Sequence, residues 1–401
     1  MVARLALTAA ALFATCPPTP ASEPGFALRC AKILTCDEDD TIVNRGMILL
    51  RGDKIEYIGK PVEVPAGYRE LDLGAVWASP GMVELHAHVV GPGFDINDMV
   101  YPVNADLSTR PSITPSNSLM RMGTAAGVTT MFLIPGSGTS MGGFGVLFKP
   151  KIDAGYEECV LRDPGGMKAA QNYNPQRGAG DVGAGWSGLS WLMEEANNRA
   201  AAAFAQGRDD FGLRNLIRVH AGELPVLIHC ASAEGVANTV RMWKVRYGTK
   251  CVVSHGSWDG YKAAGFAAKH GVPVNHGPRT MDYSRFFRSG RVVGGAAEYT
   301  AAGVPLFSLN TDSPVVPQEE LFLQGSMSAR LGADAYQMLR ALTTHPAQSI
   351  LVGDRVGSLE VGKDADIVLS SGDPLDPRSR VEVVFIDGEI QYSRQDDGQW
   401  F

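Results

Sequence analysis

Short apolar runs separated by polar segments recur along the middle of the chain, and they have the length and composition of buried strands. Eight such runs lie at 81–88, 127–136, 144–149, 166–170, 224–230, 250–256, 272–277 and 304–312. Segments with apolar residues at helical spacing separate several of them, at 190–206, 233–247, 258–270 and 334–346. Strands that alternate with helices favour a parallel sheet, and eight of them predict a (β/α)₈ TIM barrel in an α/β protein.

The two ends of the chain have a different pattern, of short strands joined by tight turns. Segments 47–59 and 383–392 both place Gly beside Asp between apolar residues, which is a hairpin signal. Since the two ends are alike, we predict that they meet in one small β-sandwich. The predicted domains are therefore a composite of 22–76 and 352–401, and a barrel over 77–351.

The first residues have the pattern of an export signal. One positive charge precedes a short apolar stretch, and small residues offer a cleavage site after Ala21. No later run is long enough to cross a membrane. The letters FATC also resemble a lipobox, which would make Cys16 a lipid anchor. We therefore expect residues 1–21 to be a signal peptide of an exported, periplasmic or extracytoplasmic protein, bound to a membrane only if Cys16 is lipidated.

Composition describes an ordinary globular protein, with 45% hydrophobic and 20% charged residues. Thirty-six basic and 43 acidic residues give a net charge of −7, and without a basic run nucleic acid is not an expected partner. None of the six cysteines forms a C-x-x-C pair, so we expect buried free thiols rather than a cysteine zinc site. Assembly into a homo-oligomer is compatible with these observations.

Residues that can bind a metal stand at the ends of five predicted strands. Two close the first strand and one closes each of four later strands: His86, His88, His229, His255, His276 and Asp312. An H-x-H spacing alone arises by chance, but barrel enzymes gather catalytic groups at these strand ends. Imidazole and carboxylate bind zinc and similar ions, which turn bound water into a nucleophile, and a nearby aspartate can accept its proton. The pattern predicts a metal site at the barrel mouth.

At these residues the chain resembles the amidohydrolase superfamily, over essentially its whole length after the signal segment. The strongest matches are PGMVELHAH, LIHC, SHG, LNTDSP and GSLEVGKDADIVL, with Glu84 where the family has Asp. PGSGTSMGGFGVLFK and GMKAAQNYNPQR resemble segments of the imidazolonepropionase-like and prolidase-like branch, although Gln171 and Tyr173 stand where that branch has Gly-Glu. These departures leave the substrate open.

The resemblance implies a ligand set and a reaction. The implied metal ligands are His86, His88, His229, His255 and Asp312, with Asp312 also the general base. Lys168 would be a carboxylated lysine that bridges two metals; Lys149 competes for this role, and a lysine on a solvated face is the alternative for Lys168. The implied reaction is hydrolysis of an amide-type C–N bond in a dipeptide, N-acyl compound or cyclic amide, with one or two divalent ions, zinc foremost.

Three residues near the seventh predicted strand are candidates for contact with a small-molecule or dipeptide-like substrate. His276 would touch the substrate or, equally well, cap a loop. Arg279 and Tyr283 would bind a substrate carboxylate, with a solvated loop as the other reading.

Two rival functions use other features of the chain. GTSMG at 138–142 fits the G-x-S-x-G nucleophile elbow of serine hydrolases, but that elbow needs a helix directly after the serine. Here a glycine-rich and then strand-like segment follows Ser140, so we interpret this loop as backbone that lines the barrel mouth. A metal-free barrel that serves as a binding scaffold is the other alternative, and the intact ligand set argues against it.

Overall fold

The computed structural model describes residues 25–91, 97–176, 185–279, 281–282 and 292–400. The predicted signal segment, Cys16 and Tyr283 lie outside these residues. Among the helices that the structure describes, none combines the length and apolar character needed to cross a membrane.

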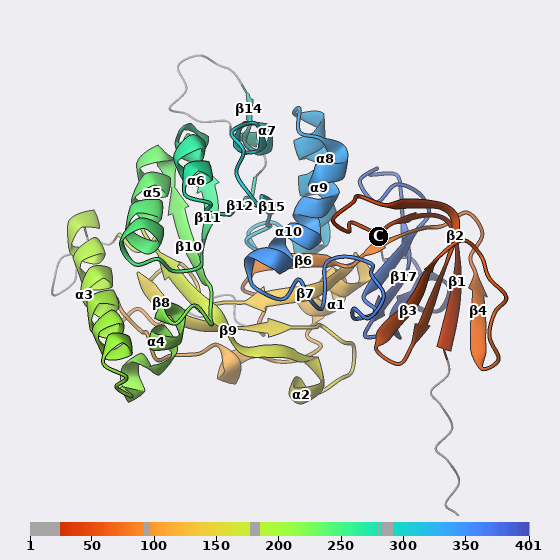
Figure 1. Ribbon diagram of the computed structural model, residues 1–401, viewed down its shortest axis with the longest axis horizontal. Helices are drawn as coiled ribbons and strands as arrows, with labels where there is room; N and C mark the ends of the chain where they lie inside the picture. Colours follow the sequence, from red (N-terminus) through yellow and green to blue (C-terminus); the bar gives the residue numbers. More distant parts are fainter. Residues whose placement is uncertain (1–24, 92–96, 177–184, 280, 283–291, 401) are drawn as a thin grey trace, which may run out of the picture.

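The middle of the chain forms an eight-stranded sheet that curls into a nearly closed barrel (Figure 1). Its strands are neighbours in chain order: β6 (Met82–Ala87), β7 (Val128–Leu133), β8 (Met141–Phe148), β9 (Val160–Ala170), β10 (Val226–Ala231), β11 (Cys251–Ser257), β12 (Val274–His276) and β15 (Ser308–Leu309). The two edges approach each other where Ala87 pairs with Ser313 and the His88 amide donates to the Ser313 carbonyl at 2.8 Å. All eight predicted strands form, and the fold is TIM-barrel-like.

One strand departs from the predicted alternation of strand and helix. β8 runs antiparallel to both β7 and β9, whereas the remaining neighbours pair in parallel. No helix separates β7 from β8, and only the four-residue α2 (Tyr156–Cys159) precedes β9. A run of apolar residues predicts a strand but not its direction. As a consequence, β8 begins at the mouth of the barrel and ends at the opposite face.

Helices cover the outside of the other strands (Figure 1). They are α1 (Ser118–Ala125), α3 (Trp186–Ala205), α4 (Arg214–His220), α5 (Ser232–Thr239) with its π-helical continuation η3 (Val240–Arg246), η4 (Gly260–Ala263), α6 (Ala264–Lys269), α7 (Gly295–Ala301), α8 (Leu321–Arg330), α9 (Ala335–Leu342) and α10 (Thr344–Ser349). The four predicted helical segments coincide with α3, with α5 and η3, with η4 and α6, and with α9 and α10. The sequence pattern does not predict α1, α4, α7 and α8.

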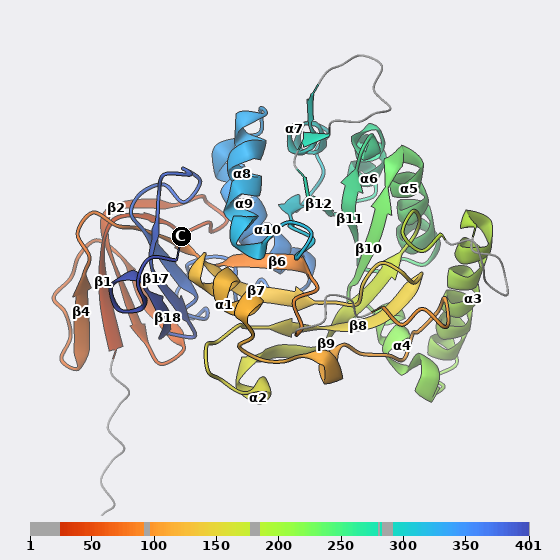
Figure 2. The ribbon, with the colours of Figure 1, turned by 180° about the vertical axis from the view of Figure 1, so that it is seen from behind.

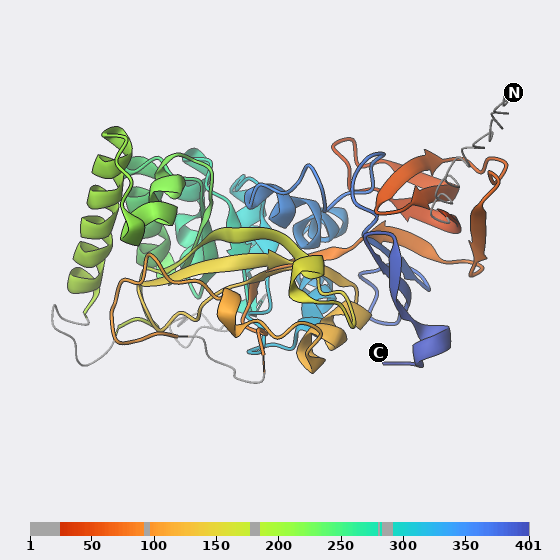
Figure 3. The same ribbon diagram turned by 90° about the horizontal axis from the view of Figure 1, so that it is seen from below.

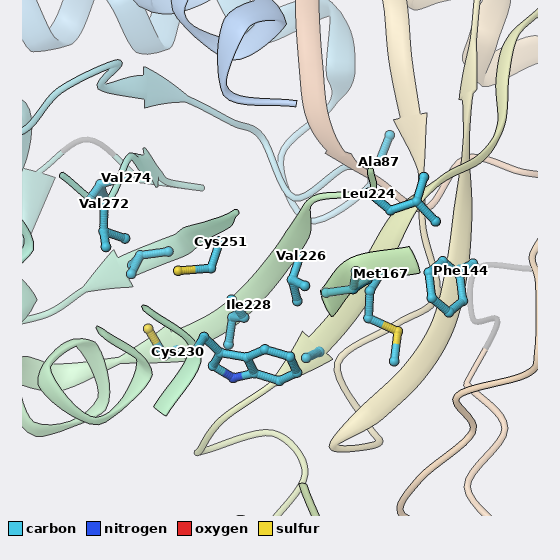
Figure 4. Packing of buried hydrophobic residues seen from close by; sticks show 14 of the residues in the cluster. Ala87, Phe144, Met167, Leu224, Val226, Ile228, Cys230, Cys251, Val272 and Val274 are labelled. Atoms are coloured by element: carbon cyan, nitrogen blue, oxygen red, sulfur yellow. The ribbon is translucent and has the colours of Figure 1, made fainter. Parts of the chain in front are cut away.

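The largest apolar cluster lies between the strands and these helices. Val226 and Ile228 of β10 belong to it, with Cys251 of β11 and Val274 of β12 (Figure 4). Cys230 of β10 is also in this cluster. The described cysteines are all buried free thiols, as expected: Cys30, Cys36, Cys159, Cys230 and Cys251.

The two ends of the chain share a second eight-stranded sheet, which lies beside the barrel (Figures 2 and 3). It contains β1 (Gly25–Leu34), β2 (Ile42–Arg51), β3 (Lys54–Gly59), β4 (Tyr68–Asp72), β5 (Trp77–Pro80), β16 (Ile367–Ser370), β17 (Val381–Ile386) and β18 (Glu389–Ser393). The ends join where β16 pairs antiparallel with β5, and both predicted hairpins form. A two-layered sandwich stays a prediction.

Candidate metal centre

The first barrel strand delivers two buried histidines to the mouth. His86 Nδ1 lies 2.7 Å from Ser254 Oγ of β11, and His88 Nδ1 lies 2.9 Å from the carbonyl oxygen of Ile134. Since a carbonyl only accepts, His88 carries its proton on Nδ1 and keeps a lone pair on Nε2. Partners of this kind hold an imidazole in the orientation that a metal ligand needs.

Asp312 faces both histidines from the turn after β15. Its Oδ1 lies 3.2 Å from His86 Nε2 and 3.3 Å from His88 Nε2, and the ligand atoms of the three groups lie within 4.8 Å of one another. Burial raises the pKa of Asp312, but the neighbouring His255, His88 and Lys168 outweigh this effect and hold the pKa below its ordinary value. The carboxylate is therefore ionised at neutral pH, as a ligand or a base must be.

Two further histidines complete a ring cluster. His229 ends the apolar part of β10, and His255 follows on β11 in a left-handed backbone conformation, with φ +70°. The His255 ring centroid lies 4.6 Å from that of His229 and 4.3 Å from that of His86. Burial is the first cause that lowers the pKa of each of these histidines, to about 4 for His255. Neutral rings with free lone pairs are the form that binds metal.

The histidines are buried without hydrogen-bond partners at several ring nitrogens. These atoms are His86 Nε2 and both ring nitrogens of His229 and of His255. A buried polar atom without a partner is rare in proteins and signals a missing ion or water. Four imidazoles and a carboxylate are also the donor set that zinc prefers. The residues present therefore fit a divalent metal ion.

Lys168 lies beside this cluster on β9 and is fully buried. Its ammonium group donates to Ser137 Oγ at 2.8 Å and to the Pro135 carbonyl at 3.2 Å. Burial excludes the reading of Lys168 as a lysine on a solvated face. Its charge also contributes to the lowered pKa of His86, after the larger effect of burial.

Lys149, the competitor of Lys168, is not brought to the histidines. Because β8 is antiparallel, its C-terminal end lies at the opposite face of the barrel, where Lys149 Nζ pairs with Asp364 at 2.7 Å and Asp366 at 3.1 Å. Asp387 is its third partner. Lys149 was a candidate at the mouth because we expected β8 to run parallel to its neighbours, whereas it runs antiparallel to both.

Glu84 has a structural role that the sequence pattern did not reveal. One carboxylate oxygen accepts from the His86 amide at 2.8 Å, and the other accepts from the amide and hydroxyl of Thr311 at 2.8 and 2.7 Å. Burial raises the pKa of Glu84 to about 7. Glu84 therefore joins the first and last barrel strands and fixes the residues next to His86 and Asp312. Ser254 was missed as well, although it directly precedes His255.

Of the predicted substrate-binding residues, His276 contacts the backbone of the cluster. His276 is fully buried; its Nδ1 lies 2.9 Å from the His255 carbonyl, and its ring packs near Tyr299 and Phe307. This placement favours a histidine that packs in the barrel wall. Arg279 is exposed beyond the end of β12, and Tyr283 lies outside the described residues.

The GTSMG loop leads into a strand, as the sequence suggested. Ser140 is buried directly before β8, and its carbonyl accepts from the amide of Ala170 at the end of β9. A nucleophile elbow requires a helix at this point. The loop thus lines the mouth through its backbone, and the serine-hydrolase alternative has no support.

Comparison with known proteins agrees with this geometry. The Amidohydrolase family matches residues 209–391. The imidazolonepropionase of Thermoplasma acidophilum is 25% identical over 90% of this chain and 92% of its own length. A solved amidohydrolase from Thermotoga maritima is 27% identical, with a TM-score of 0.83 over 92% of this chain and 100% of its own. Residues 209–391 thus form an Amidohydrolase family domain, and these similarities support a place in the amidohydrolase superfamily.

Two further similarities are more distant. Amidohydrolase tasK of Hapsidospora irregularis is 22% identical over 88% of this chain, which spans only 40% of that relative's length. A prolidase solved with N-methylphosphonate-L-proline shares the fold at 16% identity and a TM-score of 0.58, over 91% of this chain and 99% of its own. The prolidase therefore shows a shared fold. The family domain and the imidazolonepropionase match support the imidazolonepropionase-like and prolidase-like branch, and they point to a hydrolase that acts on C–N bonds.

Proposed function

We propose that this chain is a metal-dependent hydrolase of an amide-type C–N bond in a small molecule. The observation that carries the proposal is the set of buried, unpartnered imidazole nitrogens around the ionised Asp312. An imidazolonepropionase and an Xaa-Pro dipeptidase are among the similar proteins, and a cyclic amide, a dipeptide or an N-acylated amine would each fit a site of this kind.

The proposed ligands are those that the structure gathers at the mouth: His86, His88, His229, His255 and Asp312. They would hold one or two divalent ions, with zinc as the ion that imidazole-rich sites favour. Lys168, if carboxylated, would add a bridging carboxylate in place of a buried ammonium. A bound ion polarises the amide carbonyl and lowers the pKa of a coordinated water.

The chain's own residues carry the proton transfers in this proposal. Asp312 accepts the proton of the attacking water on its carboxylate and passes it to the leaving nitrogen. Glu84 and Ser254 hold the neighbouring backbone and ring in place, so that the base and the ligands keep their positions.

Other properties are proposed from sequence alone. We propose export through the N-terminal signal, with Cys16 as the residue that would add a membrane anchor, and a sandwich arrangement of the terminal sheet.

Metal analysis of the purified protein tests the proposed function. We expect about one or two divalent ions per chain. Removal of the ions with a chelator should abolish hydrolysis across a panel of dipeptides, N-acyl amino acids and cyclic amides, and zinc should restore it. Metal binding should also raise the melting temperature, since a ligand that binds only the folded state stabilises it. Hydrolysis that survives chelation would overturn the proposal.

A further inference from the structure

Two aromatic side chains meet at the mouth of the barrel, close to the histidine cluster. The rings of Tyr173 and Trp258 contact edge to face, with centroids 4.5 Å apart. Tyr173 stands three residues after the end of β9, and Trp258 directly follows β11. These strands lie on either side of β10, so the contact spans the end of the strand that carries His229.

The hydrogen bonds around this contact place it above His229. Ala231, two residues beyond His229, is held on one side by Asn172, whose side chain bonds both its amide and its carbonyl. On the other side, Ala231 pairs with Ser257 of β11. The two aromatic residues are the next in sequence after Asn172 and Ser257, and the Gln171 amide donates to the His229 carbonyl at 2.8 Å.

Both aromatic residues are held in a backbone conformation that side chains of their size rarely adopt. Tyr173 has φ +73° and Trp258 has φ +60°. Strain of this kind persists where the surroundings fix it, and it clusters at functional sites. Here Tyr173 is fixed by a bond from its amide to Gln176, and the Trp258 loop by a bond from Ser257 Oγ to the Gly277 carbonyl.

We propose that Tyr173 and Trp258 form an aromatic wall that selects substrates with an aromatic or bulky apolar group beside the scissile amide. The inference rests on the proposed hydrolase function and adds a substrate class to it. Tyr173 is 50% exposed, so part of an apolar ring faces outward at the rim of the mouth. Asp259, the acidic neighbour of Trp258, is already paired with Lys262 and the Ala233 amide, so it adds no specific attraction for a cationic substrate group.

The test compares matched substrates that differ only in the group beside the amide. The probes are N-benzoyl-alanine against N-acetyl-alanine, and Phe-Ala against Ala-Ala, with Lys-Ala as the cationic member. The wild-type protein should prefer the aromatic member of each pair by about 10- to 100-fold in kcat/KM. Preference for Lys-Ala, or no preference in either pair, would overturn the inference.

The variants separate the rings from the backbone that carries them. Tyr173→Asn and Trp258→Asn remove the rings and keep a residue that tolerates positive φ. In the double variant the preference should fall to within about threefold of unity, with metal content unchanged. Tyr173→Phe with Trp258→Phe should restore most of it. Trp191→Ala, which removes an exposed ring on α3, is the matched control and should change nothing.

Binding gives a readout that does not depend on turnover. Calorimetry of N-benzoyl-alanine and N-acetyl-alanine with the metal-loaded protein should show the same preference, and the double Asn variant should lose it. If no amide is hydrolysed, the proposed function fails, and this binding ratio still decides the aromatic wall. Equal affinity for the two probes would refute it.

Discussion

Two buried clusters of charged and ionisable side chains lie at opposite ends of the barrel, and they differ in how well their members are satisfied. At the end opposite the mouth, the ammonium of Lys149 contacts the carboxylates of Asp364, Asp366 and Asp387. We call this group the Lys149 cluster. At the mouth, neutral imidazoles surround Asp312 and leave several ring nitrogens without partners.

The difference separates a structural cluster from a functional one. The Lys149 cluster joins the barrel to the terminal sheet and carries its own compensating charges, which is what a buried charge needs to persist. The mouth cluster instead leaves buried ring nitrogens without hydrogen-bond partners, and a bound ion would satisfy them. Composition does not distinguish the two, since both contain aspartates beside basic residues.

The largest expected effect is on the mouth. His86→Ala combined with His88→Ala removes two ligands from one strand, and the purified variant should lose its metal and all measurable hydrolysis. Metal content per chain, measured by mass spectrometry, checks this outcome. A variant that keeps its full metal content would show that His86 and His88 are not metal ligands, and the mouth cluster would then not differ from the Lys149 cluster in function.

Asp312→Asn should separate ligation from proton transfer within the same cluster. The amide keeps the size and one oxygen ligand but is too weak a base, so kcat should fall by about 10²- to 10⁴-fold while much of the metal stays bound. Steady-state kinetics beside metal analysis measures both properties. Near-normal turnover would assign the base to another residue, and His276 is the first to test.

Lys149→Met should act on stability and not on metal binding. It leaves three carboxylates without their shared cation, and breaking a buried pair in this way costs about 3–5 kcal/mol of unfolding free energy. Lys54→Met is the matched control: Lys54 pairs with the same Asp364 but is 42% exposed, so its loss should cost only about 0–1 kcal/mol. Urea unfolding measures the unfolding free energy of both variants. Equal losses would show that the buried Lys149 contributes no more to stability than the exposed Lys54.

The pH dependence of Lys149→Met should have a definite sign. In the wild type the pKa of Asp364 is lowered to about 2: burial alone would raise it, but Lys149 is the largest of the effects that lower it. Asp364 therefore stabilises the fold above its unfolded pKa of 3.8, and this is lost as pH falls towards 2. Burial raises the pKa of Asp366 to about 6 even beside Lys149, which lowers it. Without Lys149 this pKa rises further, so Asp366 is protonated earlier as pH falls and the variant's deficit should shrink between pH 7 and pH 5. A constant deficit would contradict this account.

Ser140→Ala should give the smallest effect. Ser140 lines the mouth next to the proposed site, but the strand that follows it rules out the elbow geometry. Hydrolysis should stay within about threefold of the wild type. If Ser140→Ala abolished hydrolysis and a chelator did not affect the wild type, the result would support the serine-hydrolase alternative.

Much of the fold was predictable because it depends on local patterns. Each apolar run became a barrel strand, and the glycine-rich turns became hairpins. The direction of β8 was not predictable, since alternation and length are the same for a strand read either way. Because β8 runs opposite to the expected direction, Lys149 lies at the end of the barrel away from the mouth.

The site was predictable only where residues that can bind a metal stand at recognisable positions in the sequence. His86 and His88 stand at strand ends, where their type is informative. The groups that orient them leave no such mark: Ser254 is a common residue, and Glu84 reaches Thr311 across 227 positions of sequence. Contacts between distant segments follow from the closed barrel, which no local pattern contains.

The Lys149 cluster also has a consequence for a chain emerging from the ribosome. Asp364, the first of the three partners of Lys149 to be synthesised, is made 215 residues later, which takes about 10–40 s at ordinary rates of synthesis. Until then a barrel closed around Lys149 would hold an uncompensated ammonium away from water. The end of the nascent barrel opposite the mouth must therefore stay hydrated. Lys149 can be buried there only after the last strands of the terminal sheet have been translated.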